Sequence, residues 1–109
     1  MNTPVSYSRR GGAKVGAVSA TWPFGKIEVA NGAVTVSVMG RRRTLTVAEV
    51  LRAEPLGFFS NSSDGPGVRI FFRGQHWEEY VDFYSSSGWR EAFAELKVAG
   101  FNVVEPPAR

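Results

Sequence analysis

The sequence predicts an α+β fold that is mainly β. We expect a strongly bent antiparallel sheet, or a partly open barrel, of about six to seven strands capped by one C-terminal helix. Two observations predict the sheet: apolar and polar residues alternate in short runs over residues 21–84, and Gly-containing turns separate the runs. A third observation, helical spacing of apolar residues near the C-terminus, predicts the helix.

The length of 109 residues is that of one domain with one core. Apolar residues make up 43% and aromatic residues 13% of the chain, which favours a packed fold over disorder. Residues 1–17 are rich in Gly, Ser and Arg without a period and are interpreted as a flexible basic leader. We therefore expect the domain over residues 18–105 and a loose tail over residues 106–109.

The first strand of the expected sheet contains a bend. Trp22 and Phe24 occupy even positions, whereas Ile27 and Val29 occupy odd positions, so the inward-facing parity changes across Gly25. A glycine at such a change is typical of a bulge or sharp bend. One long strand can then serve two faces of a curled sheet.

Two turns follow the bent strand. Asn31–Gly32 is a strong signal for a two-residue hairpin, because a type I′ turn needs positive φ at both central positions. The return strand over residues 33–38 alternates valine with small residues. Gly40 with Arg41–Arg43 is expected to form the next turn, before a strand that contains Leu45 and Val47.

The middle of the chain gives mixed signals. Residues 48–57 fit a short strand or a helical turn, and we expect a strand from Val50 because Pro55 and Gly57 forbid a long helix. Residues 60–67 consist of turn formers and predict an exposed loop. Alternation then predicts strands over residues 68–73 and 80–84, with a turn at Gly74–Gln75.

The last element is an amphipathic helix. Its apolar residues recur at helical spacing, and its charged residues fall on the other side. Ser87 is the expected N-cap, and Gly100 fits the left-handed position after the helix, where Phe101 can contact Leu96. The expected buried stripe consists of Trp89, Ala92, Phe93 and Leu96.

Three segments together resemble bacterial pleckstrin-homology-like (PH-like) domains: residues 21–29, residues 67–70, and the closing helix with its tail over residues 89–104. The resemblance spans roughly residues 20–104 and implies two nearly orthogonal sheets with the helix plugging one open end. Phosphoinositide-binding members place basic residues on the first two strands. Here Lys26 lies on the first strand, but Thr35 and Ser37 occupy the second, which argues against specific inositol-phosphate recognition.

The composition argues against several kinds of chemistry. With no Cys and one His, at position 76, the usual structural zinc sites and thiol nucleophiles are excluded, so we expect no metal and no cofactor. His76, Asp82 and the serines lack the spacing of a known hydrolase motif. We therefore predict that the protein is not an enzyme.

Charge and hydropathy bear on location and partners. The net charge of +3 comes from Arg9, Arg10 and Lys14, since residues 18–109 carry ten basic and ten acidic side chains. This balance argues against a nucleic-acid partner. The sequence contains no run typical of a signal peptide or a membrane span, so a cytoplasmic location is expected.

Two groups of residues are candidate binding sites. Phe71 has the opposite strand parity from its apolar neighbours and Trp77 lies beside a turn, so both are candidate anchors for a protein partner or a second copy; alternatively, Phe71 faces the helix or the leader. Arg41, Arg42 and Arg43 are a candidate contact with an anionic membrane or another polyanion, or else solvated charges that protect a sheet edge. The sequence thus predicts a protein-interaction module, with binding to anionic lipid as the alternative.

Overall fold

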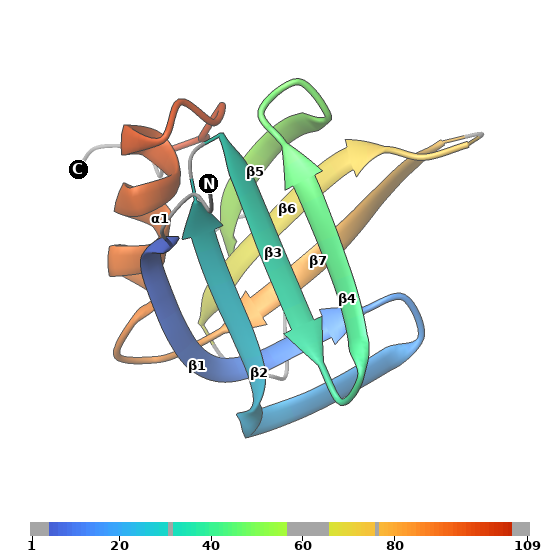
Figure 1. The fold of residues 1–109 in the computed structure, drawn as a ribbon, viewed down its shortest axis with the longest axis vertical. Helices are drawn as coiled ribbons and strands as arrows, with labels where there is room; N and C mark the ends of the chain where they lie inside the picture. The colour runs from blue at the N-terminus through green and yellow to red at the C-terminus, as the bar shows by residue number, and fades with distance from the viewer. Residues whose placement is uncertain (1–4, 31, 57–65, 76, 106–109) are drawn as a thin grey trace.

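A computed structural model describes residues 5–30, 32–56, 66–75 and 77–105. Within these residues the chain forms seven strands and one helix (Figure 1). The elements are β1 (Val5–Val15), β2 (Val18–Ala30), β3 (Ala33–Val38), β4 (Arg41–Thr46), β5 (Val50–Leu56), β6 (Gly67–Arg73), β7 (Glu78–Tyr84) and α1 (Trp89–Val98). The predicted strand from Val50 is confirmed, whereas most of the loop predicted over residues 60–67 lies outside the described residues.

All the strand pairs are antiparallel and belong to one open sheet, in the order β4-β3-β2-β1-β7-β6-β5. Helix α1 lies across one end of the bent sheet (Figure 1). The predicted α+β, mainly β fold class is therefore confirmed, and the layout is compatible with a PH-like fold. No helix in the described ranges has the length and apolar character needed to cross a membrane.

The N-terminal segment is a correction to the sequence prediction. Residues 1–17 were expected to form a flexible leader, but Val5–Val15 is the central strand β1, which pairs with β2 on one side and with β7 on the other. Gly11 and Gly12 are buried here without side chains that could reveal a strand period. Arg9 lies beside α1, where its guanidinium donates to the Ser87 hydroxyl (3.1 Å) and contacts the Glu91 carboxylate (3.5 Å).

The predicted bend in the first long strand lies where β1 and β2 cross closely. Gly25 pairs with Gly11, but the next pair joins Ala13 to Ala20, so residues 21–24 leave the ladder. A Cβ on Gly25 would lie 2.4 Å from the carbonyl carbon of Gly12 and would clash with it. Only glycine, which has no Cβ, fits at this position without a shift of the backbone. Because the backbones are this close, the sheet can turn sharply at this point.

The core lies on the inner face of the sheet, which we define by the buried valines of β3. Alternate residues of the strands point to this face, and the apolar stripe of α1 covers part of it. Each fully buried large side chain stabilises the fold by about 1.5–3 kcal/mol. The largest fully buried side chains include Phe83, Ile27, Leu45, Ile70 and Leu96.

The helix ends as predicted and begins differently. Gly100 has φ +98°, its N–H donates to the Lys97 carbonyl (3.1 Å), and the Phe101 N–H donates to the Leu96 carbonyl (3.0 Å). This pattern is the Schellman motif that satisfies the last carbonyls of a helix. The prediction of Ser87 as N-cap is wrong, because Gly88 is the cap residue and its N–H donates to the Ser85 hydroxyl (2.9 Å).

The sequence predicts the turn between β2 and β3 better than the turn between β3 and β4. Ala30 pairs with Ala33 and Gly32 has φ 76°, as the predicted two-residue hairpin requires, while Asn31 lies outside the described residues. The next turn is wrongly predicted: Val38 pairs with Arg41, so Met39–Gly40 forms the turn and Arg41–Arg43 belongs to β4. Met39 (φ 45°) and Gly40 (φ 85°) both have the positive φ that a type I′ turn requires.

Candidate functional site

The three arginines predicted as a cluster are divided between the two faces of β4. Arg41 and Arg43 pair with Val38 and Val36 and share their inner-face parity, whereas Arg42 points to the outer face. The guanidinium carbon of Arg43 lies 4.5 Å from the centroid of the Phe72 ring, so this side chain covers the edge of the core. The sequence cluster is therefore not a single basic patch.

Arg42 instead belongs to a row of basic residues that crosses four strands. Arg10 pairs with Lys26, Lys26 pairs with Ser37, and Ser37 pairs with Arg42, so these side chains share the outer face. We call Arg10, Lys26 and Arg42 the basic rung. Arg10 and Arg42 are exposed, while the Lys26 ammonium lies 3.8 Å from the Glu28 carboxylate, which partly offsets its charge.

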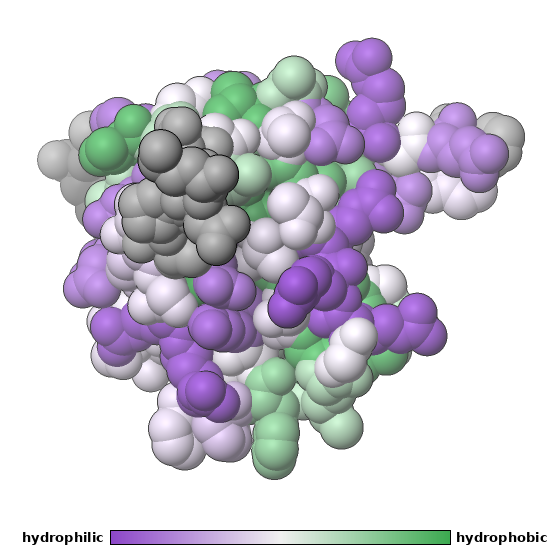
Figure 2. Space-filling model, viewed as in Figure 1, coloured by the Kyte–Doolittle hydropathy of each residue, from purple (hydrophilic) through white to green (hydrophobic). Residues whose placement is uncertain are grey.

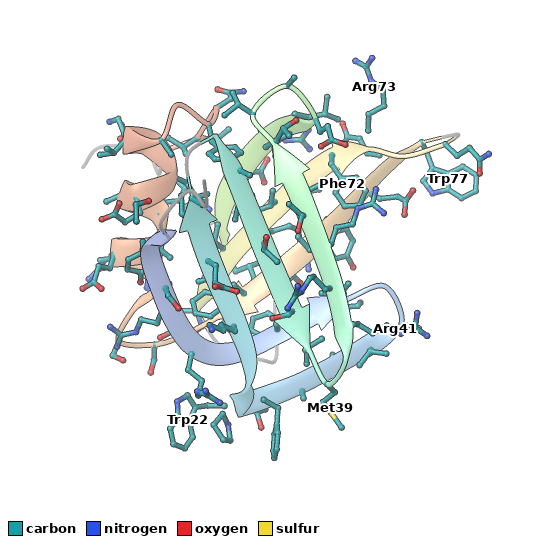
Figure 3. The ribbon with its side chains drawn as sticks, viewed as in Figure 1. Trp22, Met39, Arg41, Phe72, Arg73 and Trp77 are labelled. Atoms are coloured by element: carbon teal, nitrogen blue, oxygen red, sulfur yellow. The ribbon has the colours of Figure 1, made fainter. Side chains whose placement is uncertain are left out.

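Next to the basic rung, three large apolar side chains project into solvent. The exposed fractions are 69% for Trp22, 61% for Phe24 and 67% for Met39, and we call these residues the apolar corner. Figure 3 shows Trp22 and Met39 at the same end of the molecule, and Phe24 directly precedes Gly25, the partner of Val38. In Figure 2 apolar surface gathers at this lower end, below the hydrophilic face.

The exposure of the apolar corner corrects the inward orientation expected for Trp22 and Phe24. Both residues belong to the four-residue segment that leaves the β1–β2 ladder, so strand parity does not turn them toward the core. The Arg10 guanidinium reaches the same segment and donates to the Pro23 carbonyl (3.4 Å). The basic rung therefore reaches the backbone between Trp22 and Phe24.

Phe71 lies on the outer face, at a distance from the apolar corner. Its ring lies between the guanidinium of Arg52, 4.0 Å from the ring centroid, and the ring of Tyr80, with centroids 6.0 Å apart. Arg52 in turn donates to the Glu78 carboxylate at 3.0 and 3.1 Å and to the Glu54 carboxylate at 2.8 Å. The half-buried Phe71 is thus flanked by side chains of β5 and β7, on the face opposite the one that α1 covers.

The charges around Phe71 stabilise one another. Hydrogen bonds to Glu78 and Glu54 raise the pKa of Arg52, and the same contact with Arg52 lowers the pKa of Glu78. Both groups are therefore held in their charged forms on the outer face.

Trp77 lies at the tip of the β6–β7 hairpin, at the other end of the molecule from Trp22 (Figure 3). Its side chain is 73% exposed, and its carbonyl accepts from the Gly74 N–H (2.9 Å). Figure 3 also shows Arg73 at this end, whereas Arg41 lies toward the opposite end. The predicted site residues Phe71, Trp77 and Arg41–Arg43 therefore do not form one surface.

Asp82 is the one buried charged residue among the described residues, and no local pattern in the sequence predicts its partners. Its carboxylate accepts two hydrogen bonds from Arg69 (2.8 and 2.9 Å) and one from the Tyr84 hydroxyl (2.8 Å). The hydrogen bonds to Asp82 raise the pKa of Arg69. Asp82 thus has a structural role in joining β6 and β7. His76, which the sequence analysis did not assign to a hydrolase motif, lies outside the described residues.

A shallow pocket lies between Trp22 of the apolar corner and Tyr84, the residue whose hydroxyl donates to Asp82. Its volume is about 210 Å³, and its lining includes Gly12 of β1, Trp22 of β2 and Tyr84 of β7, together with residues that precede β6 and follow β7. The pocket extends the apolar surface around Trp22 toward the sheet.

Comparison of the sequence with protein-family models and with curated proteins gives no match. Function is therefore inferred from the surface alone. The basic rung depends on the register of four strands, a long-range property that sequence spacing does not reveal. Pro23 within the expected strand is the one local sign of the segment that carries the apolar corner, because proline cannot donate to a strand ladder.

Proposed function

We propose that this chain is a non-enzymatic, PH-like binding module that docks on an anionic lipid surface through the basic rung and the apolar corner. The observation that supports the proposal is that Arg10, one of three basic residues in a row, donates to the backbone of the segment from which the exposed Trp22 and Phe24 project. Tryptophan is favoured at membrane interfaces, where its ring meets both headgroups and hydrocarbon. Exposed large apolar side chains beside basic ones are typical of proteins that bind membranes peripherally.

The dimensions of the surface suit simultaneous contact. Neighbouring strands lie about 4.8 Å apart, so the backbones of Arg10 and Arg42 are separated by roughly 14 Å. Lys26 follows Phe24 by two positions, which corresponds to about 7 Å along the strand. Arginine and lysine side chains can therefore reach lipid phosphates while the apolar corner enters the interface.

The electrostatic contribution follows from the three cations. A basic residue near an anionic membrane contributes about 1 kcal/mol. Because Glu28 partly offsets Lys26, we expect about 2–3 kcal/mol from the basic rung, equivalent to a roughly 30- to 150-fold change in partitioning. This contribution decreases with salt, since the Debye length is about 10 Å at 0.1 M ionic strength.

The first function expected from the sequence, binding to a partner protein or to a second copy of the chain, stays a prediction. Its anchor in this proposal is Trp77 rather than Phe71, because the Phe71 ring is flanked by Arg52 and Tyr80. The two candidate functions use opposite ends of the molecule, so they can be tested separately (Figure 3).

Vesicle co-sedimentation tests the proposal. We expect binding to phosphatidylcholine vesicles that contain phosphatidylserine, weaker binding to phosphatidylcholine alone, and a decrease with salt. Two variants should lose binding: Trp22→Ala/Phe24→Ala/Met39→Ala, and Arg10→Gln/Lys26→Gln/Arg42→Gln. Arg73→Gln/Trp77→Ala is the matched control at the other end and should bind as the wild type does. Binding that survives both corner and rung substitutions would contradict the proposal.

A further inference from the structure

Strand β4 forms one edge of the sheet, and its backbone shows which residues face outward. In an antiparallel pair, residues alternate between directing both backbone groups to the partner strand and directing both away. The Val47 N–H donates to the Gly32 carbonyl (3.1 Å), whereas the Thr46 N–H donates to the Glu49 carboxylate (2.9 Å) and so points away from β3. Arg42 and Thr44 have the same phase as Thr46 and therefore present their N–H and C=O groups at the open edge.

One end of this edge is already occupied by Glu49. Its N–H donates to the Thr46 carbonyl (3.0 Å), and its carboxylate accepts from both the N–H (2.9 Å) and the hydroxyl (3.1 Å) of Thr46. These hydrogen bonds lower the pKa of Glu49, and the charge of Arg43 adds to the effect. The chain thus provides its own example of a carboxylate held at the β4 edge.

The other edge of the sheet is protected differently. The tail after α1 runs beside β5, where the Ala53 N–H donates to the Asn102 carbonyl (2.8 Å) and the Val104 N–H donates to the Ala53 carbonyl (2.8 Å). In the part of the chain that the structure describes, no strand lies beyond β4. The β4 edge is therefore the one available for pairing with another chain.

We propose that the β4 edge binds an extended acidic segment of a partner protein, which adds one strand to the sheet. The outward groups of Arg42 and Thr44 supply the backbone hydrogen bonds, as in other cases of strand addition. Arg42 lies on the outer face, while Arg41 and Arg43 lie on the inner side of the same strand, so acidic side chains on either face of the added strand meet arginine. This site goes beyond lipid docking, because it uses the backbone of the edge.

A second copy of the chain fits this edge less well. Pairing β4 with itself would bring the arginines of both copies together, and like charges across a strand pair are destabilising. An acidic segment instead has charge complementary to a strand that contains three arginines and no acidic residue. The chemistry of the edge therefore favours a different, acidic chain.

The test measures fluorescence anisotropy with a capped, labelled peptide of about six residues in which Glu and Val alternate, a length typical of a strand. Thr44→Pro removes an outward N–H that takes no part in the β3–β4 ladder, and should weaken binding at least tenfold. Thr44→Val keeps the N–H and loses only the hydroxyl, so it is the matched control and should bind within about twofold of the wild type. The same peptide with Lys in place of Glu should not bind.

A second arm leaves the protein unchanged. In an added strand, alternate peptide N–H groups point toward β4 and the others point away from it. N-methylation of the amides that point toward β4 should abolish binding, whereas N-methylation of the amides that point away should not. The proposal would be overturned if the wild type bound the Lys peptide as well as the Glu peptide. It would also be overturned if Thr44→Pro bound the Glu peptide as the wild type does and if both methylated peptides bound the wild type without loss. A concentration-dependent dimer in analytical ultracentrifugation that Thr44→Pro abolishes would overturn it in favour of a second copy. Vesicle binding of Thr44→Pro should remain, which separates this test from that of lipid docking.

Discussion

Replacement of Arg69 should destabilise the protein more than replacement of its partner Asp82. Asp82 is completely buried, whereas the Arg69 side chain is 20% exposed and lies 4.0 Å from the centroid of the Tyr80 ring. Arg69→Met leaves a buried carboxylate with only the Tyr84 hydroxyl as partner, which costs about 3–5 kcal/mol. Asp82→Asn leaves a guanidinium that still reaches solvent and the Tyr80 ring, and we expect about 1.5–3 kcal/mol.

Urea unfolding followed by tryptophan fluorescence measures these differences, provided that the slope of the transition is unchanged. The double variant Arg69→Met/Asp82→Asn completes the cycle. Because the two residues are in direct contact, the double variant should be more stable than the sum of the single effects by about 1–3 kcal/mol. Equal or reversed single effects, or additivity within about 0.5 kcal/mol, would refute the assignment of a buried pair that joins β6 and β7.

Three further predictions concern stability and titration. Gly25→Ala should lower the free energy of unfolding by about 1–3 kcal/mol or more, because its Cβ would lie 2.4 Å from the Gly12 backbone; urea unfolding checks this, and an unchanged midpoint would contradict the close crossing. Gly100→Ala should cost about 1 kcal/mol in the same assay, because φ there is +98°, and no loss would argue against the Schellman ending. Burial, with a contribution from Glu91, raises the pKa of Tyr7 to about 12 from the ordinary value of 10.0. Since the neutral form is favoured in the fold, the resulting stability is complete below pH 10.0 and is lost as the pH rises through about 12. Tyr7→Phe should weaken this alkaline dependence in unfolding experiments, and an identical dependence would contradict the prediction.

Local signals explain which parts of the fold could be predicted. The buried stripe of the helix, its Gly100 ending and the pairing of Ala30 with Ala33 depend on residues that are close in sequence, so a local pattern contains their signal. Strand β5 could also be inferred, because Pro55 restricts the alternatives.

The parts that the sequence did not predict depend on contacts between distant segments. Strand β1 lacks a visible apolar period because Gly11 and Gly12 fill buried positions where two strands cross, and this crossing requires small residues. Trp22 and Phe24 have the spacing of core residues, and only the departure of their segment from the ladder exposes them. The basic rung requires the register of β1 to β4, which no window of sequence contains.

In the proposed lipid docking, the end of the molecule with Trp22, rather than the end with Trp77, enters an anionic membrane. The most direct measurement is quenching of tryptophan fluorescence by brominated lipid in phosphatidylserine-containing vesicles. We expect quenching in the wild type and in Trp77→Phe, and loss of most quenching in Trp22→Phe while co-sedimentation with the vesicles continues. Quenching that persists in Trp22→Phe and disappears in Trp77→Phe would contradict docking through the Trp22 end.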